Sequence, residues 1–319
     1  MGRTALKKLA LFLLAALIML AAAGCSDMPA ANGRARDGFK IFRYRGKELA
    51  LPERPQRVVL LSSALTELWA GAGGADKLAG CPLSGELDGK IKSSLKKETI
   101  DIGVGAALNV EKILEIQPDL VVGLEDKALH GKIKTVMAAN KIPYLEVKNL
   151  LFQDNCEILR LFGQLLHEEE RTEALISGMR QKIASARRLQ QGRAPVKVLM
   201  LWGSVSNVMM ITPNSRQGEL LAMAKGVNIV PPSAKEHGYL PVSLEFIVER
   251  QPDVILLQGH GDKEKMQKCL KQDVLDNPAW NSLQAVRQGR VYFLPPEIFT
   301  VNPGLKTPEA VVYLSKIIY

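Results

Sequence analysis

The side chains that most often carry out chemistry are few and scattered in this chain of 319 residues. There are four His and four Cys, and no two histidines have the HExxH spacing of a zinc enzyme. The chain has no P-loop and no GxSxG motif, and its GAGG run follows a predicted helix, which indicates a turn and not a dinucleotide site. A catalytic α/β protein and a carrier of bare metal ions are therefore lesser alternatives.

Four side chains stand where α/β proteins usually bind ligands, at the ends of predicted strands or in a loop before a helix. His260 directly follows one strand, Ser63 and Trp202 end two others, and Tyr239 lies in the HGYLP loop. A neutral imidazole can bind a metal, and aromatic faces pack against flat, poorly hydrated rings. These four are candidate ligand-binding residues. Core packing is the alternative for Trp202, and an exposed loop position is the alternative for His260.

The N-terminus has the pattern of an export signal. A basic start precedes an uncharged apolar run over 9–23, which is short for a membrane span of about 20 residues. Small residues then lead into Cys25, as at the lipidation site of bacterial lipoproteins, although Ala22 stands where leucine is usual. We expect a signal peptide over 1–24, a lipid anchor on Cys25, a tether and entry segment over 25–55, and a folded protein on the extracytoplasmic face of the cell membrane. An ordinary signal peptide cut nearby is the alternative.

Composition excludes several other classes of protein. With 47% hydrophobic and 24% charged residues, the chain is an ordinary globular protein, long enough for about two domains. The formal charge of +9 falls to +6 without the basic start, and charges of both signs are interspersed, so no nucleic-acid partner is expected. Cys81, Cys156 and Cys269 fit no metal motif. A disulfide would leave one of them over, so buried or free thiols are favoured.

Apolar runs alternate with amphipathic stretches along the chain, which predicts an α/β fold with mostly parallel sheets in two Rossmann-like lobes. The predicted strands are 57–63, 78–83, 119–123, 144–147, 196–202, 207–212, 253–257 and 290–294. The predicted helices are 64–72, 109–117, 126–140, 215–225, 243–251, 262–271 and 308–319.

An internal repeat supports the two lobes. The segment NVEKILEIQPDLVV at 109–122 matches SLEFIVERQPDVIL at 243–256, with a constant offset of 134 residues. Each copy begins with a good helix N-cap, carries a glutamate in the first turn (Glu111 or Glu245), and ends its helix at Gln-Pro-Asp. Two lobes of one design are the simplest explanation.

A single long helix is predicted between the two copies. The range 168–191 has almost no Pro or Gly, and its apolar residues recur at helical spacing. A helix of this length spans roughly 35 Å and would bridge an N-terminal lobe over 56–167 and a C-terminal lobe over 192–319. An ordinary surface helix is the alternative.

Together these motifs resemble a family, the class III solute-binding proteins that serve ABC importers of ferric siderophores, haem and cobalamin. The resemblance rests on RVVLLSS at 57–63, the two QPD segments, NPAWNSLQAVRQGRVYFLP at 277–295 and NPG at 302–304. It extends over about residues 56–319. It implies two α/β lobes joined by one long helix, a ligand held in the cleft between them, no intrinsic cofactor and no catalytic activity.

The resemblance also implies partners and residue roles. The ligand, a ferric siderophore or haem with cobalamin as the alternative, would pass to an ABC permease dimer with its ATPase subunits. In the haem-binding branch a histidine in a segment similar to LQGH is an axial iron ligand, so His260 is a metal ligand if the ligand is haem. That branch has a methionine where this chain has Ala106 and Ala107. Glutamates placed like Glu111 and Glu245 dock against permease arginines, and stabilisation by the helix dipole is the alternative reason for them.

Overall fold

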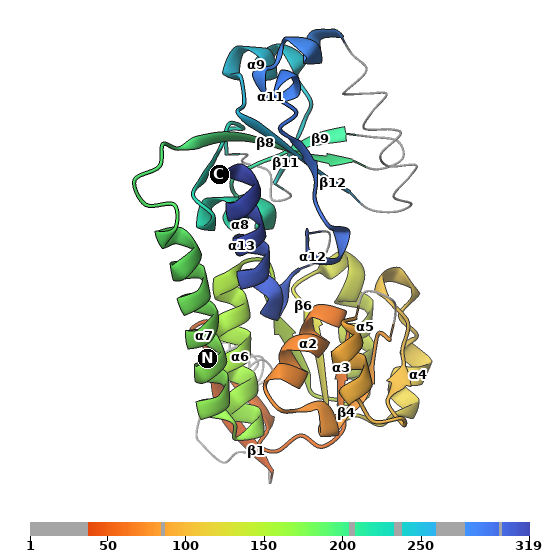
Figure 1. Ribbon diagram of the computed structural model, residues 1–319. Helices are drawn as coiled ribbons and strands as arrows, with labels where there is room; N and C mark the ends of the chain where they lie inside the picture. The colour runs from red at the N-terminus through yellow and green to blue at the C-terminus, as the bar shows by residue number, and fades with distance from the viewer. Residues whose placement is uncertain (1–37, 84–86, 204–207, 233–237, 260–277, 300–301) are drawn as a thin grey trace, which may run out of the picture. The chain divides into compact units, whose positions relative to one another are not determined.

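The computed structural model describes residues 38–83, 87–203, 208–232, 238–259, 278–299 and 302–319, and within them it has two α/β lobes (Figure 1). The first lobe is built on a parallel sheet in the order β5-β4-β3-β6-β7. Its strands are β3 (Val58–Leu60), β4 (Leu78–Cys81), β5 (Ile100–Asp101), β6 (Leu120–Leu124) and β7 (Tyr144–Val147). Because neighbouring strands are parallel, their carboxyl ends share one edge of the sheet, where open α/β sheets bind ligands.

The second lobe is built on a mixed sheet in the order β11-β9-β8-β12-β13, with β10 also paired to β8. Strands β8, β10, β12 and β13 are parallel, and β9 and β11 are antiparallel additions. The strands are β8 (Val196–Gly203), β9 (Val208–Ile211), β10 (Gly226–Asn228), β11 (Tyr239–Pro241), β12 (Val254–Gly259) and β13 (Val291–Phe293). The predicted α/β fold with mostly parallel sheets is confirmed.

Local sequence sets where several of the connecting helices begin. Ser62, Asn109, Ser215 and Ser243 each cap a helix, because each side chain accepts the backbone N–H three residues further on. The helices are α2 (Ser63–Gly71), α3 (Gly89–Ser94), α4 (Val110–Glu115), α5 (Lys127–Ala139), α6 (Phe152–Leu166), α7 (Glu169–Arg188), α8 (Arg216–Met223), α9 (Leu244–Arg250), α11 (Gln284–Arg287), α12 (Pro296–Phe299) and α13 (Thr307–Ile318). The helix predicted over 262–271 lies outside the described residues.

The sequence repeat is also a structural repeat. Asp119 accepts the backbone N–H of Arg57 at 3.1 Å, and Asp253 accepts that of Lys197 at 2.7 Å, at the start of the central strand of each lobe. The side chains of Arg57 and Lys197 also donate to equivalent backbone carbonyls at the ends of the repeated helices. These are the carbonyls of Ile116 and Arg250, which are 134 residues apart. Each Gln-Pro-Asp segment therefore fixes the end of a helix to the start of β3 or β8.

The backbone bends in the same way at both repeats. Gln117 has a φ of 49° and Gln251 a φ of 45°, a left-handed conformation that glutamine seldom adopts. Pro118 and Pro252 follow, and proline cannot continue a helix. The same rare backbone conformation at both places supports a common design for the two lobes.

Helix α7 occupies the range of the predicted bridging helix and contributes to the cores of both lobes. Its first half adds Ile176 and Met179 to the core of the first lobe, and its second half adds Ile183 and Ala186 to the core of the second. Acidic residues lie in its first turn and basic residues in its last, as the helix dipole favours. One rigid helix therefore supports both cores.

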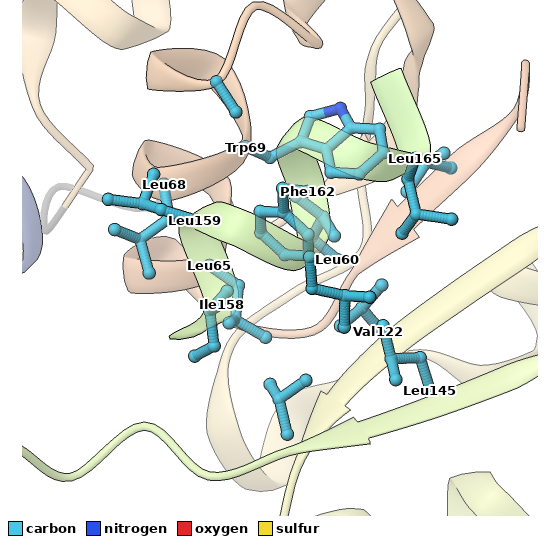
Figure 2. Packing of buried hydrophobic residues seen from close by; sticks show 14 of the residues in the cluster. Leu60, Leu65, Leu68, Trp69, Val122, Leu145, Ile158, Leu159, Phe162 and Leu165 are labelled. Carbon is cyan, nitrogen blue, oxygen red and sulfur yellow. The ribbon is translucent and has the colours of Figure 1, made fainter. Parts of the chain in front are cut away.

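Trp69 and Phe162 lie in the core of the first lobe, where α2 packs against α6. Their ring centroids are 4.9 Å apart at 80°, an edge-to-face contact. Figure 2 shows leucines of both helices around this pair, against Leu60 and Val122 of the sheet. The indole N–H of Trp69 donates to the carbonyl of Gly74 at 2.7 Å, so this large side chain is buried without an unpaired polar atom.

The N-terminal hairpin is among the parts of the described chain that were not predicted. Part of the expected entry segment forms an antiparallel hairpin of β1 (Phe39–Tyr44) and β2 (Lys47–Pro52). Arg45 and Gly46 make its two-residue turn with φ values of 51° and 74°, the positive values that tight hairpins need. The Arg45 guanidinium binds Asp154 of α6 at 2.8 Å, which ties the hairpin to the first lobe.

Candidate functional site

The predicted residue Ser63 lies just beyond β3. The strand predicted over 57–63 ends at Leu60, because Ser62 already caps α2 by accepting the N–H of Leu65 at 3.2 Å. Ser63 is therefore the first residue of α2. Its hydroxyl oxygen is buried and has no hydrogen-bond partner within the described part of the chain. Such a group costs about 1–3 kcal/mol, which makes this edge of the sheet a place where a ligand or water would be favoured.

Two more buried polar atoms without partners lie beside β6. Nδ1 of His130 accepts the backbone N–H of Leu124 at 2.8 Å, while its Nε2 has no partner among the residues described. The Tyr144 hydroxyl is also unpaired there, and a Cβ at Gly123 would overlap it. Burial lowers the pKa of His130, so the ring is neutral and its proton is on Nε2. Neither residue was singled out from the sequence.

The second lobe places two predicted residues together. The rings of Trp202 on β8 and Tyr239 on β11 lie with centroids 5.9 Å apart. The register partner of Trp202 on β12 is Gln258, which is 1% exposed. Neither Nε2 nor Oε1 of Gln258 has a partner in the described chain. The carboxyl end of this sheet therefore carries an aromatic pair and an unsatisfied amide, and the amide was not predicted.

Arg216, the first residue of α8, is a further charged group at this place that sequence reasoning missed. Its Nε donates to the carbonyl of Leu150 at 3.2 Å, and it forms no ion pair with any described residue. Burial lowers the pKa of Arg216, against the opposite effects of Tyr239 and Glu219. Burial likewise raises the pKa of Tyr239, against the effects of Arg216 and Gln217. A partly buried guanidinium that forms no ion pair within the described ranges suits an anionic group of a ligand.

The other predicted residues lie elsewhere. His260 and Cys25 are outside the described residues, and their roles remain predictions. Glu111 and Glu245 are exposed in the first turns of α4 and α9, at equivalent positions of the repeat and not at the strand ends.

The described residues contain no group of three or more His, Cys, Asp or Glu that could hold a metal ion. Cys81 and Cys156 are buried and free, as favoured from the sequence, and Cys269 lies outside the described residues. Burial raises the pKa of the Cys81 thiol to about 12, so it is an inert core residue. None of the helices in the described ranges has both the length and the apolarity needed to cross a membrane.

A groove of about 800 Å³ runs between α7 and α13, away from the strand ends. Its lining includes Gln190 and Ser315, each with a buried oxygen that has no partner among the described residues. The groove is otherwise mostly apolar, and it brings together none of the residues predicted from the sequence.

Comparisons with known proteins agree with this architecture. The profile of a family described as periplasmic binding protein matches residues 58–298. The high-affinity heme uptake system protein IsdE of Staphylococcus aureus (strain Newman) is 27% identical over 144 residues, which are 45% of this chain and 48% of that protein. The chain thus spans about half the length of the curated relatives it matches.

Solved structures match over more of the chain at lower identity. The S. aureus IsdE complexed with heme has a TM-score of 0.69 at 20% identity, covering 82% of this chain and 98% of that one. The periplasmic vitamin B12 binding protein BtuF of Vibrio cholerae has a TM-score of 0.65 at 19% identity, covering 84% and 98%. At these identities the likeness shows the two-lobe fold.

Proposed function

The chain belongs to the periplasmic binding protein family, and on that premise we propose that it is the substrate-binding protein of an ABC importer. It captures an iron complex, a ferric siderophore or haem, and delivers it to a permease dimer with its ATPase subunits. A lipid on Cys25 holds it at the extracytoplasmic face of the membrane. The relatives named for heme uptake and vitamin B12 binding support this class of cargo, with cobalamin as the alternative.

One observation carries the proposal. Among the described residues, four with a buried and unpartnered polar atom lie beside or just beyond strands of the two sheets. Ser63 follows β3, the His130 ring binds the last residue of β6, the Tyr144 hydroxyl lies beside Gly123 of β6, and Gln258 is the penultimate residue of β12. Unpaired buried groups oppose folding, so selection tolerates them where they serve another purpose. A cargo with polar edges, held between the lobes, would satisfy them.

The remaining side chains at these edges fit a flat or anionic cargo. The faces of Trp202 and Tyr239 can pack against a ring system, and Arg216 can pair with a carboxylate or a negatively charged chelate. His260 would bind the iron if the cargo is haem, since a neutral imidazole nitrogen donates to that metal. In this proposal the metal is part of the cargo, and the protein contributes binding and no catalysis.

The proposal is tested on the purified protein. An absorption spectrum detects co-purified haem by its Soret band, and native mass spectrometry detects colourless cargo. In titrations with haem, ferric siderophores and cobalamin, the protein should then bind one of these three classes with a dissociation constant of about 1 μM or lower. Failure of all three classes to bind would contradict the proposed function.

A further inference from the structure

Gln258 is a buried primary amide to which the described part of the chain supplies no hydrogen bond. It is the penultimate residue of β12 and is 1% exposed. Neither its donor Nε2 nor its acceptor Oε1 has a partner within the described part of the chain. Buried polar side chains in native proteins are nearly always hydrogen-bonded. A group beyond the described residues, such as a bound cargo, would satisfy both sides of this amide.

The position of Gln258 in the sheet shows which side it faces. Val254 and Leu256 of β12 belong to the same core cluster against which Trp202 packs. Side chains along a strand alternate, so Gln258 lies on that same face. Trp202 is its register partner on β8 and contacts Tyr239. The amide is thus next to the aromatic pair, at the end of the sheet where a ligand is expected.

We propose that Gln258 determines specificity by binding an edge of the cargo that carries both an N–H donor and a C=O acceptor. This inference rests on the proposed function and narrows its cargo. An ionised carboxylate offers acceptors only, so it would satisfy Nε2 and leave Oε1 unpaired. A carboxamide satisfies both atoms. The cargo is then an amide-bearing complex, either a siderophore with amide linkages or cobalamin with its carboxamide side chains, in preference to haem with its carboxylates.

The cargo can reach an amide that is covered in the ligand-free protein. Rotation of Gln258 to another staggered rotamer would present its amide to the cargo. Pairing the donor and the acceptor would offset the cost of that rotation, since an unpaired buried polar group costs about 1–3 kcal/mol. The paired amide is then the more stable state once a complementary edge is present. Binding and side-chain rotation are coupled in this way.

Gln258→Met in the full-length protein is the test, because methionine removes both polar atoms at similar volume. The ligand-free variant should unfold at a higher temperature than wild type, since its unpaired amide is gone. Its affinity for cobalamin and for an amide-linked ferric siderophore should fall by about tenfold or more, while its affinity for haem stays unchanged. Gln258→Leu repeats the measurement if the methionine variant does not fold.

Gln190→Met is the matched control. Gln190 is also buried with an unpaired Oε1, but it lines the α7–α13 groove and donates to Ser315. Its substitution should leave all ligand affinities unchanged.

Two results would overturn the inference and leave the proposed function standing. In the first, wild type and Gln258→Met bind an amide-bearing complex with equal affinity. In the second, Gln258→Met loses affinity for haem to the same extent as for the amide-bearing complex. If wild type binds none of the three classes, the proposed function fails and the inference fails with it.

Discussion

His130 holds the end of β6 through a hydrogen bond that only its neutral form can make. Nδ1 accepts the N–H of Leu124 at 2.8 Å, and the side chain is 1% exposed. Burial lowers its pKa, although the charges of Asp126 and Glu146 oppose that effect. A proton on Nδ1 would face the Leu124 N–H and break the bond. The turn that follows β6 at the candidate site therefore depends on a neutral ring.

We expect this histidine to make stability depend on pH. Its pKa is about 6.5 when unfolded and lower when folded, so the unfolded chain binds more protons between these two values. The contribution is complete above about pH 6.5 and is lost as the pH falls through the lower folded pKa. His130→Asn keeps an acceptor for Leu124 and does not titrate. Between about pH 7.5 and about pH 5.5, the free energy of unfolding measured in urea should fall more for wild type than for this variant. Equal losses would contradict the assignment.

Ser63 and Trp202 of the candidate site could be predicted from the sequence. Each follows or ends a run of apolar residues that is typical of a buried strand, and such a run can be recognised without knowing the fold. Gln258 was missed because what marks it is an amide without a partner among the described residues, and Arg216 because what marks it is a guanidinium without an ion-pair partner there. Both features depend on how distant segments pack. His260 remains a prediction from its position after β12.

At the scale of elements, the two equivalent aspartates of the repeat differ in the number of hydrogen bonds that they accept from described residues, so we expect them to contribute unequally to stability. Asp119 accepts two backbone N–H groups, from Gln56 at 2.6 Å and Arg57 at 3.1 Å, whereas the only such bond of Asp253 among the described residues comes from Lys197 at 2.7 Å. Hydrogen bonds to a charged group contribute about 1.5–3 kcal/mol each.

Asp119→Ala should therefore lower the free energy of unfolding more than Asp253→Ala does. Urea denaturation of both variants measures this difference, which should be about 1.5–3 kcal/mol, the contribution of the one additional hydrogen bond of Asp119. Asp76→Ala is the control, since that side chain is 63% exposed and should change stability little. An equal or larger loss of unfolding free energy for Asp253→Ala would contradict this prediction.

The elements found from the sequence are those with strong local patterns. The repeated helices have a cap, an apolar stripe and a Gln-Pro-Asp stop, and α4 and α9 begin at the predicted caps. Helix α6 was not named, although Ile158, Phe162 and Leu165 recur at helical spacing on its buried face. The β1–β2 hairpin was missed because its turn is Arg-Gly and lacks the usual Asn-Gly or Asp-Gly signal.

At the scale of the whole molecule, the proposed anchor makes a direct prediction. If Cys25 is diacylated, Cys25→Ala should release the protein from membranes. A lipid contributes about 0.8 kcal/mol per buried methylene, so two chains hold a protein stably where one does not. Membrane fractionation after a high-salt wash is the measurement, because salt removes purely electrostatic binding. A variant that still sediments with membranes would show that something other than this lipid holds it.

The repeat also gives each lobe one exposed glutamate at an equivalent position, and we expect these two glutamates to meet a two-fold partner. Glu111 and Glu245 lie in the first turns of α4 and α9, 134 residues apart. A carboxylate there is stabilised by the helix dipole by about 0.3–1 kcal/mol, which alone would justify it. A permease dimer has two equivalent subunits, and matched charges on two lobes would orient the complex. Single exposed ion pairs contribute about 0.2–1 kcal/mol, but complementary charge steers association.

We expect Glu111→Arg with Glu245→Arg to abolish permease binding and uptake while affinity for the cargo is kept. The matched control is Glu115→Arg with Glu249→Arg, because these two glutamates are exposed, lie on the same two helices and are also equivalent in the repeat. The control makes the same change in net charge outside the first turn, so it should keep transport. Transport by the first double variant, or equal loss in the control, would contradict docking through these two positions. Cargo affinity and thermal unfolding of both variants separate a docking defect from damage to the fold, since charge reversal at the first turn costs about 0.6–2 kcal/mol per helix.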